Sequence, residues 1–274
     1  MKNILVAVDF SKASLNAANY AVSFAQTLDA NIFLLNVIPP RLIIDDSVLA
    51  SVLITQAELL ETNERLMKEE VESLSENAGI DIKGLVTEGF PSDIISKIAN
   101  DIKADLIITG MKGKGKSNSV FGSTATAVIR KSGFPVLVIP EKGDYQPINN
   151  ITFASDFDPD IESESYDVLI KLAQKLNIPV YILNIQKKDC GLGAERVIGK
   201  MKTSLAFSKL HPQFHSVYEK NVEEGINKFI ENNPTDVLAM VAHTHNVFER
   251  MLGTVHTKEM SYKTKIPLLI LPEK

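Results

Sequence analysis

A glycine-rich, lysine-bearing stretch from Gly110 to Thr124 has the composition of a loop that binds phosphate. Glycines let the backbone approach a bound anion closely, and successive N–H groups can then line an anion-binding concavity. The lysines between the glycines make the stretch locally positive, and a helix expected from Ser123 directs its N-terminal amides toward the same place. These residues favour a polyphosphate site, and the alternative is a basic, solvated surface loop.

The spacing of these glycines differs from two common nucleotide motifs. The stretch reads Gly110-x2-Gly113, then eight residues, then Gly122-Ser123. No G-x-x-x-x-G-K-[ST] occurs, and the glycines follow the fourth predicted strand rather than the first. Asp9 ends the first predicted strand and Gly110 ends the fourth, and we expect these strands to flank the crevice where an open parallel sheet binds ligands.

These residues are positioned by strands that alternate with helices. The apolar patterns predict strands at 4–8, 32–38, 80–87, 105–109 and 135–139, and helices at 13–29, 48–77, 91–100 and 123–132. This order predicts an α/β fold, an open twisted parallel five-stranded sheet with helices on both faces. The segment 41–77 is interpreted as an amphipathic helix that covers the sheet, or alternatively as a lid near the crevice.

The pattern then restarts after a polar segment at 141–149 that contains Gly and Pro and predicts a linker. Runs at 151–157, 179–185, 236–241 and 266–272 echo the first, second, fourth and fifth strands in the same order, and Asp156 repeats Asp9. The second copy is about 15 residues shorter, and we expect the loss in its second helix. The chain is therefore predicted to contain two tandem domains related by a pseudo-two-fold axis, residues 1–142 and 149–274.

With these motifs, the sequence resembles the universal stress protein family in its tandem-domain form, over essentially the whole chain. ATP-binding members of that family carry G-x2-G-x9-G-[ST] after the fourth strand, and the loop in this chain is one residue shorter. The resemblance implies a Rossmann-like, adenine nucleotide alpha hydrolase-like fold and side-by-side pairing of the fifth strands in an intrachain pseudo-dimer, with a further homodimer of chains. It also implies an N-terminal site for ATP, with Mg²⁺, formed by Asp9, Val37, Gly110, Met111, Gly113, Gly122, Ser123 and Thr124.

The second copy departs from this pattern. We align His243 and Asn246 with Gly110 and Gly113, and predict that this half does not bind ATP in the family's manner. His243, His245 and His256 are candidate zinc ligands, but their spacing matches no metal motif, and hydrogen bonding at the domain interface is favoured. His211 and His215 lie beside a predicted edge strand and are expected to be solvated.

Composition restricts the partners and the location. The net charge of -5 argues against binding of nucleic acid, which usually needs a basic face. No apolar stretch approaches the roughly 20 residues of a membrane span, and no signal peptide is evident. Cys190 is the single cysteine, as is common in the reducing cytoplasm, so we expect a cytoplasmic protein without a membrane partner.

The residues suggest binding rather than catalysis. No Ser-His-Asp arrangement with a nucleophile elbow is found. We expect a stress-response protein that binds an adenine nucleotide in a regulatory role, with slow hydrolysis at most. The alternatives are a nucleotide-independent interaction module that acts through dimerisation and protein contacts, and an ATP-dependent enzyme.

Overall fold

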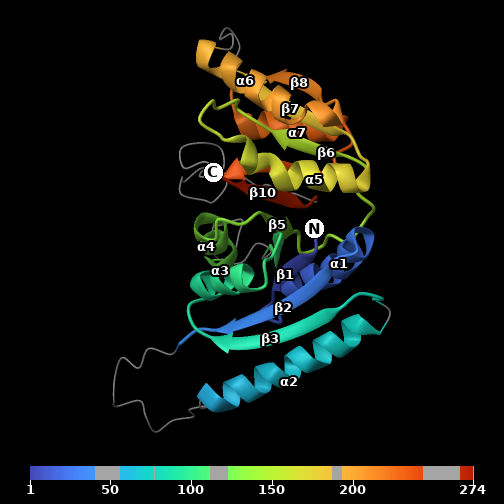
Figure 1. The fold of residues 1–274 in the computed structure, drawn as a ribbon, viewed down its shortest axis with the longest axis vertical. Coiled ribbons are helices and arrows are strands. Elements are labelled where there is room, and N and C mark those ends of the chain that lie inside the picture. The colour runs from blue at the N-terminus through green and yellow to red at the C-terminus, as the bar shows by residue number, and fades with distance from the viewer. Residues whose placement is uncertain (41–55, 77, 112–122, 187–192, 243–265, 274) are drawn as a thin grey trace.

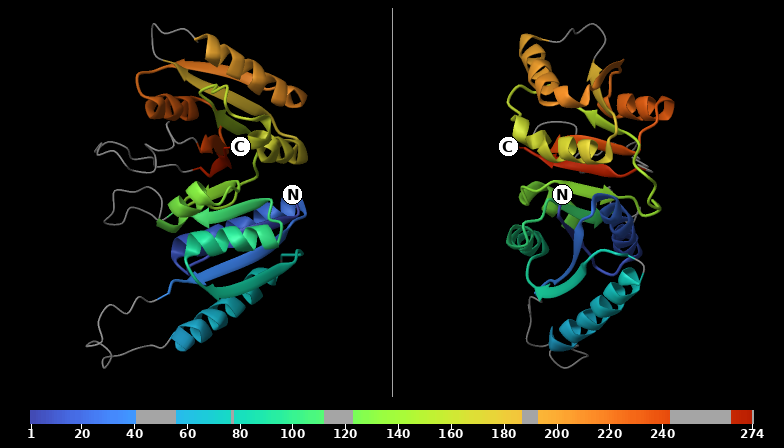
Figure 2. Two further views of the ribbon diagram at one scale, coloured as in Figure 1. Left: turned by 60° about the vertical axis from the view of Figure 1, so that its left-hand side comes forward. Right: turned by 45° about the vertical axis from the view of Figure 1, so that its right-hand side comes forward.

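The computed structural model describes residues 1–40, 56–76, 78–111, 123–186, 193–242 and 266–273. Its strands form one ten-stranded sheet in the order β3-β2-β1-β4-β5-β10-β9-β6-β7-β8, with helices on both faces (Figures 1 and 2). This arrangement confirms the predicted fold class.

The first half contains five strands and four helices among its described residues. They are β1 (Asn3–Ala7), α1 (Lys12–Leu28), β2 (Asn31–Ile38), α2 (Gln56–Ser75), β3 (Ile82–Glu88), α3 (Pro91–Asp101), β4 (Leu106–Gly110), α4 (Ser123–Lys131) and β5 (Val136–Ile139). Each lies where the apolar pattern predicts it, within a few residues, except that the first part of the helix expected at 48–77 falls outside the described residues.

The second half repeats the strand order, with its first two α-helices shorter than those of the first half. Its elements are β6 (Ile151–Ala154), the 3₁₀-helix η2 (Ser163–Tyr166), α5 (Asp167–Leu176), β7 (Val180–Gln186), α6 (Ala194–Ala206), the 3₁₀-helix η3 (Ser208–Leu210), β8 (Gln213–Tyr218), α7 (Val222–Asn232), β9 (Val237–Ala242) and β10 (Leu268–Pro272). As predicted, the second copy is shortened between its second and third strands, where α2 has 20 residues and α6 has 13.

The two halves meet through their fifth strands. All strand pairs within each half are parallel, whereas β5 and β10 are antiparallel, with Leu137 opposite Leu269. The predicted intrachain pairing of the fifth strands is therefore confirmed. Both strands are buried along their whole length. Each would be an edge strand in its own half, and the pairing covers both edges.

Each face of the sheet carries a hydrophobic core that extends across this junction. On one face the core contains buried side chains of α1, α2 and α5, together with Leu137 and Leu269. On the other face it contains buried side chains of α3, α4 and α7, together with Val138 and Leu268. Strands that are buried on both faces explain the nearly continuous apolar runs of the sequence.

Matching left-handed backbone conformations in the two halves confirm the duplication. Phe10 and Phe157, each following the aspartate after the first strand, have φ of 57° and 58°. Asp29 and Asn177, the residues that end α1 and α5, have φ of 51° and 52°. Non-glycine residues rarely adopt this left-handed conformation, so its recurrence at matching places indicates a common ancestral unit.

The segment that the sequence predicts to be a linker connects the two halves without regular secondary structure. Residues 141–149 form no helix or strand, and Tyr145 from this segment packs edge-on against Tyr20 of α1, with ring centroids 5.1 Å apart.

The described part of the segment 41–77 is α2, which lies along β3 and buries Met67 and Leu74 (Figure 1). None of the described helices is long and apolar enough to cross a membrane.

The continuous cores predict that the two halves unfold together. Phe207 is fully buried in the second half and stacks on Phe153 at 5.5 Å between ring centroids. Phe207→Ala should cost about 3–5 kcal/mol and accelerate global amide exchange by about a hundredfold or more, in β1 and β4 as well as in β6 and β9. Hydrogen–deuterium exchange measures this. Phe90→Ala, which removes a ring that is 60% exposed, is the control and should change little. Acceleration confined to the second half would contradict the prediction.

Candidate functional site

The candidate site lies at the carboxyl ends of β1 and β4, where the strand order of the first half reverses. β1 pairs with β2 on one side and with β4 on the other, so the connections that follow β1 and β4 leave in different directions. Ligands of open α/β sheets bind in the crevice at such a point. Asp9, Val37, Gly110 and Met111 all lie at this edge, as the sequence predicts.

Asp9 is held at the N-terminus of α1. Its carboxylate accepts a hydrogen bond from the Ser11 backbone N–H at 3.0 Å, and its own N–H donates to Ser14 Oγ at 3.2 Å. Burial raises the pKa of Asp9, but hydrogen bonds from Ser11 and Ser14 outweigh that effect and leave the pKa below its ordinary value of 3.8. The group is therefore a carboxylate at neutral pH, and it presents acceptor oxygens to a ligand in the crevice.

Val37 presents its backbone to the crevice because a side chain ends the ladder between β1 and β2. The Val8 N–H donates to Leu35 O at 2.9 Å, so the peptide groups of Val37, two residues later, face the same side of β2. If the ladder continued, the Val37 N–H would donate to the Val8 carbonyl oxygen. That oxygen instead accepts a hydrogen bond from Asn36 Nδ2 at 2.9 Å. The Val37 amide and carbonyl therefore face the crevice, and the Val37 side chain is half-buried.

Gly110 is required by packing as well as by any ligand. A Cβ at this position would collide with the backbone of Ala13, at the start of α1, and would lie 2.9 Å from the Ser14 nitrogen. The next residue, Met111, is buried and donates its N–H to Ile139 O at 2.8 Å. The glycine thus lets the first turn of α1, which holds Asp9, lie directly against the end of β4.

The remaining predicted ligands are only partly within the described residues. α4 begins at Ser123, and Thr124 in its first turn is exposed. This places the N-terminal amides of a nine-residue helix after the loop, as the sequence predicts. Gly113, Gly122 and the loop lysines lie outside the described residues.

The second crevice has a different register from the one that sequence spacing suggests. Asp105 and Asp236 mark the start of the fourth strand in each half, because each accepts hydrogen bonds from two backbone N–H groups at the point where its half's first strand begins. Five residues further along stand Gly110 and Val241, which pair with equivalent residues of β5 and β10. The alignment of His243 with Gly110 is therefore wrong by two residues, whereas the alignment of Asn246 with Gly113 lies outside the described residues. Spacing alone could not reveal this, because the second loop also differs in length.

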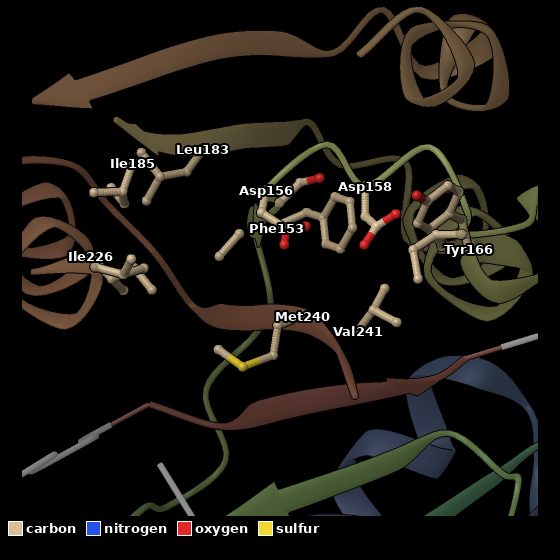
Figure 3. Close-up of a pocket in the computed structure, with 13 residues that line it drawn as sticks. Phe153, Asp156, Asp158, Tyr166, Leu183, Ile185, Ile226, Met240 and Val241 are labelled. Atoms are coloured by element: carbon tan, nitrogen blue, oxygen red, sulfur yellow. The ribbon is translucent and has the colours of Figure 1, made fainter. Parts of the chain in front are cut away.

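A valine fits at position 241, where the first half requires a glycine, because the helix after the first strand of the second half starts later in the chain than α1 does. In the first half α1 begins at Lys12, whereas in the second half α5 begins only at Asp167, after an irregular segment and η2. The space that the first turn of α1 occupies is open in the second half, where a cavity of about 80 Å³ lies over the carboxyl ends of β6, β7 and β9 (Figure 3). Asp156, the counterpart of Asp9, lines it.

Of the five histidines, only His211 and His215 lie within the described residues. His243, His245 and His256 lie outside the described residues, and within those residues no cluster of three potential metal ligands occurs. His211 is exposed, as expected. The expectation that His215 is solvated is wrong, because its ring packs between Tyr181 and Phe229 at 5.6 and 5.1 Å between centroids, and its Nε2 atom is buried. The side chain points into the layer under α7 rather than outward from the edge strand.

Asn36 is the functional residue that sequence reasoning missed, and Asn184 repeats it. Asn184 Nδ2 donates to Ser155 O at 2.8 Å, as Asn36 Nδ2 does to Val8 O. Both asparagines are almost fully buried. A buried polar side chain in an otherwise apolar strand, present in both copies, was the available signal.

Comparisons with known proteins agree with this architecture. The model of the universal stress protein family matches residues 1–140. A universal stress protein of Methanocaldococcus jannaschii is 32% identical over 139 residues, which are 50% of this chain and 81% of that protein.

Two crystal structures match along almost the whole chain. A universal stress protein from Archaeoglobus fulgidus superposes with a TM-score of 0.69 at 17% identity, covering 99% of this chain and 98% of that one. A protein of unknown function from Pseudomonas aeruginosa superposes with a TM-score of 0.57 at 14% identity, covering 100% and 93%. At these identities the two structures support the fold alone.

The packing of Gly110 generates a stability prediction. Gly110→Ala should destabilise the protein by about 1–3 kcal/mol, because the added methyl displaces α1 from the end of β4. Urea unfolding without ligand measures this. Gly143→Ala is the control, since a Cβ there makes only ordinary contacts of 3.4 Å or more with Pro140, and it should change stability by less than about 0.5 kcal/mol. Equal stability of the two variants would show that Gly110 is not required for packing.

Proposed function

The chain belongs to the universal stress protein family, and we propose that its N-terminal half binds one ATP, with Mg²⁺, at the carboxyl ends of β1, β2 and β4. The observation that carries the proposal is the convergence of the Asp9 carboxylate and the Val37 backbone on one crevice, beside the chain that leads into the glycine loop. The role is that of a regulatory ligand in a stress-response protein.

The two ends of the nucleotide find different partners in this site. The amide and carbonyl of Val37 match the alternating donors and acceptors on the edge of adenine, and the Asp9 carboxylate accepts hydrogen bonds from ribose hydroxyls. The phosphates lie toward Thr124 and the first turn of α4, where helix amides favour negative charge. The loop between Gly110 and Gly122 supplies further amides and lysines, as its sequence indicates.

The second half is proposed not to bind ATP in this manner. Val241 stands where the first half has a glycine, and Asp158 stands where the first half has Ser11, two residues after the aspartate that follows the first strand. A second carboxylate in the crevice repels phosphate, and the branched side chain narrows the approach to the strand end. The expected stoichiometry is therefore one nucleotide per chain.

Strong ATP hydrolysis is not part of the proposal. A general base works best when its pKa lies near the operating pH, whereas the hydrogen bonds to Asp9 keep the pKa of that carboxyl below its ordinary range. Asp9 is suited to accept hydrogen bonds rather than protons. Binding of the nucleotide, with slow turnover at most, fits this chemistry.

Isothermal titration with ATP and Mg²⁺ tests the proposal. The wild-type chain should bind one nucleotide, Gly122→Val should abolish binding, and Asp9→Ala should weaken it about tenfold or more through loss of charged hydrogen bonds. Asp144→Ala, which removes an exposed carboxylate on the connecting segment, is the control and should bind normally. Absence of any heat or thermal shift with the wild-type chain would refute the proposal.

The pH dependence of that binding follows from the lowered pKa of Asp9. Below its ordinary value of 3.8 the group is still partly ionised, so its contribution to binding should stay constant from pH 8 to about pH 5 and fall only in stronger acid. The contribution of Asp9 is measured as the difference in ATP affinity between the wild-type chain and Asp9→Ala across this pH range. A difference that shrinks between pH 7 and pH 5 would show that the pKa of Asp9 is raised well above its ordinary value, against the prediction.

A second candidate function, self-association, is favoured by an apolar stripe on α6. Ile198, Met201 and Leu205 follow each other at spacings of three and four residues and are 53%, 68% and 76% exposed. Helices with this spacing pack together along one seam. The proposed occupant is the same helix of a second copy in antiparallel orientation, because Glu195 near one end then meets Lys209 beyond the other end.

Sedimentation of α6 variants tests this interface. Met201→Glu should convert a dimer into a monomer, because two carboxylates would meet at the centre of the seam. Arg196→Glu, which reverses an exposed charge on the side of the helix away from the stripe, should leave the dimer intact. A monomeric wild-type chain at micromolar concentration would exclude the self-association.

A further inference from the structure

The cavity of the second half exists because the chain after β6 takes a different path from the chain after β1. Ser11 caps α1 directly after Asp9, whereas the chain after Asp156 continues irregularly until η2 starts at Ser163. Gly199 lets α6 lie directly against the backbone of Phe157 in this irregular segment. The cavity is thus built by the fold of this half.

Most of the cavity wall is apolar. The apolar side chains nearest the strand ends are Phe153, Leu183, Ile185, Ile226, Met240 and Val241. The volume of about 80 Å³ is several times the roughly 15 Å³ that a single water molecule needs, so the cavity has room for a small organic group. Met240 stands where the first half has Thr109, which makes the second crevice the more apolar one.

The polar part of the wall is acidic. Asp156 and Asp158 both line the cavity (Figure 3), as do Phe153 and Tyr166, whose rings contact each other at 5.4 Å between centroids. Burial raises the pKa of Tyr166, a hydrogen bond with Thr203 lowers it, and the nearby charges of Asp156 and Asp158 raise it further. Among the 13 described residues of the wall, none is lysine, arginine or histidine.

We propose that this second crevice binds a small organic amine, with its apolar body against Ile185, Ile226 and Met240 and its ammonium group at Asp156 and Asp158. The inference concerns the second half and does not depend on nucleotide binding in the first. The duplicated fold then carries two sites of opposite preference, one for an anionic nucleotide and one for an apolar cation.

The charge and shape of the cavity select this ligand class over the alternatives. An ammonium group makes charge-assisted hydrogen bonds to carboxylates, and aromatic rings such as those of Phe153 and Tyr166 attract cations. A carboxylate or phosphate on the same apolar body meets like charge, and an alcohol of the same size gains only neutral hydrogen bonds. A fully hydrophilic cation leaves the apolar wall exposed to water.

Three probes with one apolar body test the proposal: 2-phenylethylamine, 2-phenylethanol and 3-phenylpropionate. Titrations of the full chain at neutral pH, followed by calorimetry and by methyl NMR of Met240 and Ile185, should show saturable binding of the amine at one site. The alcohol and the acid should bind about tenfold more weakly or worse. Failure of the amine to bind at millimolar concentration, or equal binding of the acid, would overturn the proposal.

Matched carboxylate variants locate the site. Asp158→Asn and Asp156→Asn should each weaken amine binding about fivefold or more and leave the weak alcohol binding unchanged. Glu162→Gln removes the same charge from an exposed position of the same segment and should bind the amine normally. Thermal unfolding confirms that the variants fold. Normal amine binding by both aspartate variants would overturn the assignment.

Competition separates this inference from the proposed nucleotide site. The amine should bind equally well with and without saturating ATP, and equally well to Gly122→Val. Displacement of the amine by ATP would place it in the first crevice and overturn the proposal. Amine binding by a chain that fails to bind ATP would leave this inference standing while refuting the nucleotide site.

Discussion

The antiparallel pairing of β5 with β10 is the interaction on which the rest of the structure depends. Each strand is apolar on both faces, and a free edge of that composition would pair with other chains. By covering each other, the two edges turn a pair of five-stranded sheets into one ten-stranded sheet. The cores on both faces become continuous across the junction, so each half is part of the environment that stabilises the other.

Within this common frame, the start of one helix decides what each crevice can bind. α1 begins immediately after Asp9 and packs on Gly110, so the carboxylate is held at a helix N-terminus. In the second half the equivalent turn is missing, Val241 replaces the glycine, and a mostly apolar cavity with Asp158 on its wall opens instead. A duplicated domain thus keeps its strands and changes its ligand chemistry through a short connection, which is the part of such folds that tolerates change best.

Much of the fold and part of the site were predictable from sequence. Apolar runs bounded by Gly, Pro and Asp located the strands, and their repetition revealed the two halves. The positions of Asp9 and Gly110 at one edge followed from the rule for parallel sheets, and Val37 was added by the family resemblance. The register of the second crevice did not follow, because loop spacing aligned His243 with Gly110, whereas backbone pairing with β10 puts Val241 in that position, opposite Leu271. The burial of His215 depended on Tyr181 and Phe229, which are distant in sequence.

The sequence by itself determined the repeated α/β order, the acidic residue after each first strand and the restriction of the glycine loop to one copy. These are local patterns, and local patterns are set by residues that are neighbours in the chain. Only the tertiary structure decided that Asn36 ends a ladder to free the Val37 backbone, that Gly110 makes room for α1, and that the second crevice contains a cavity. Each of these is a contact between segments that are distant in the chain, and such contacts exist only once the sheet has brought the segments together.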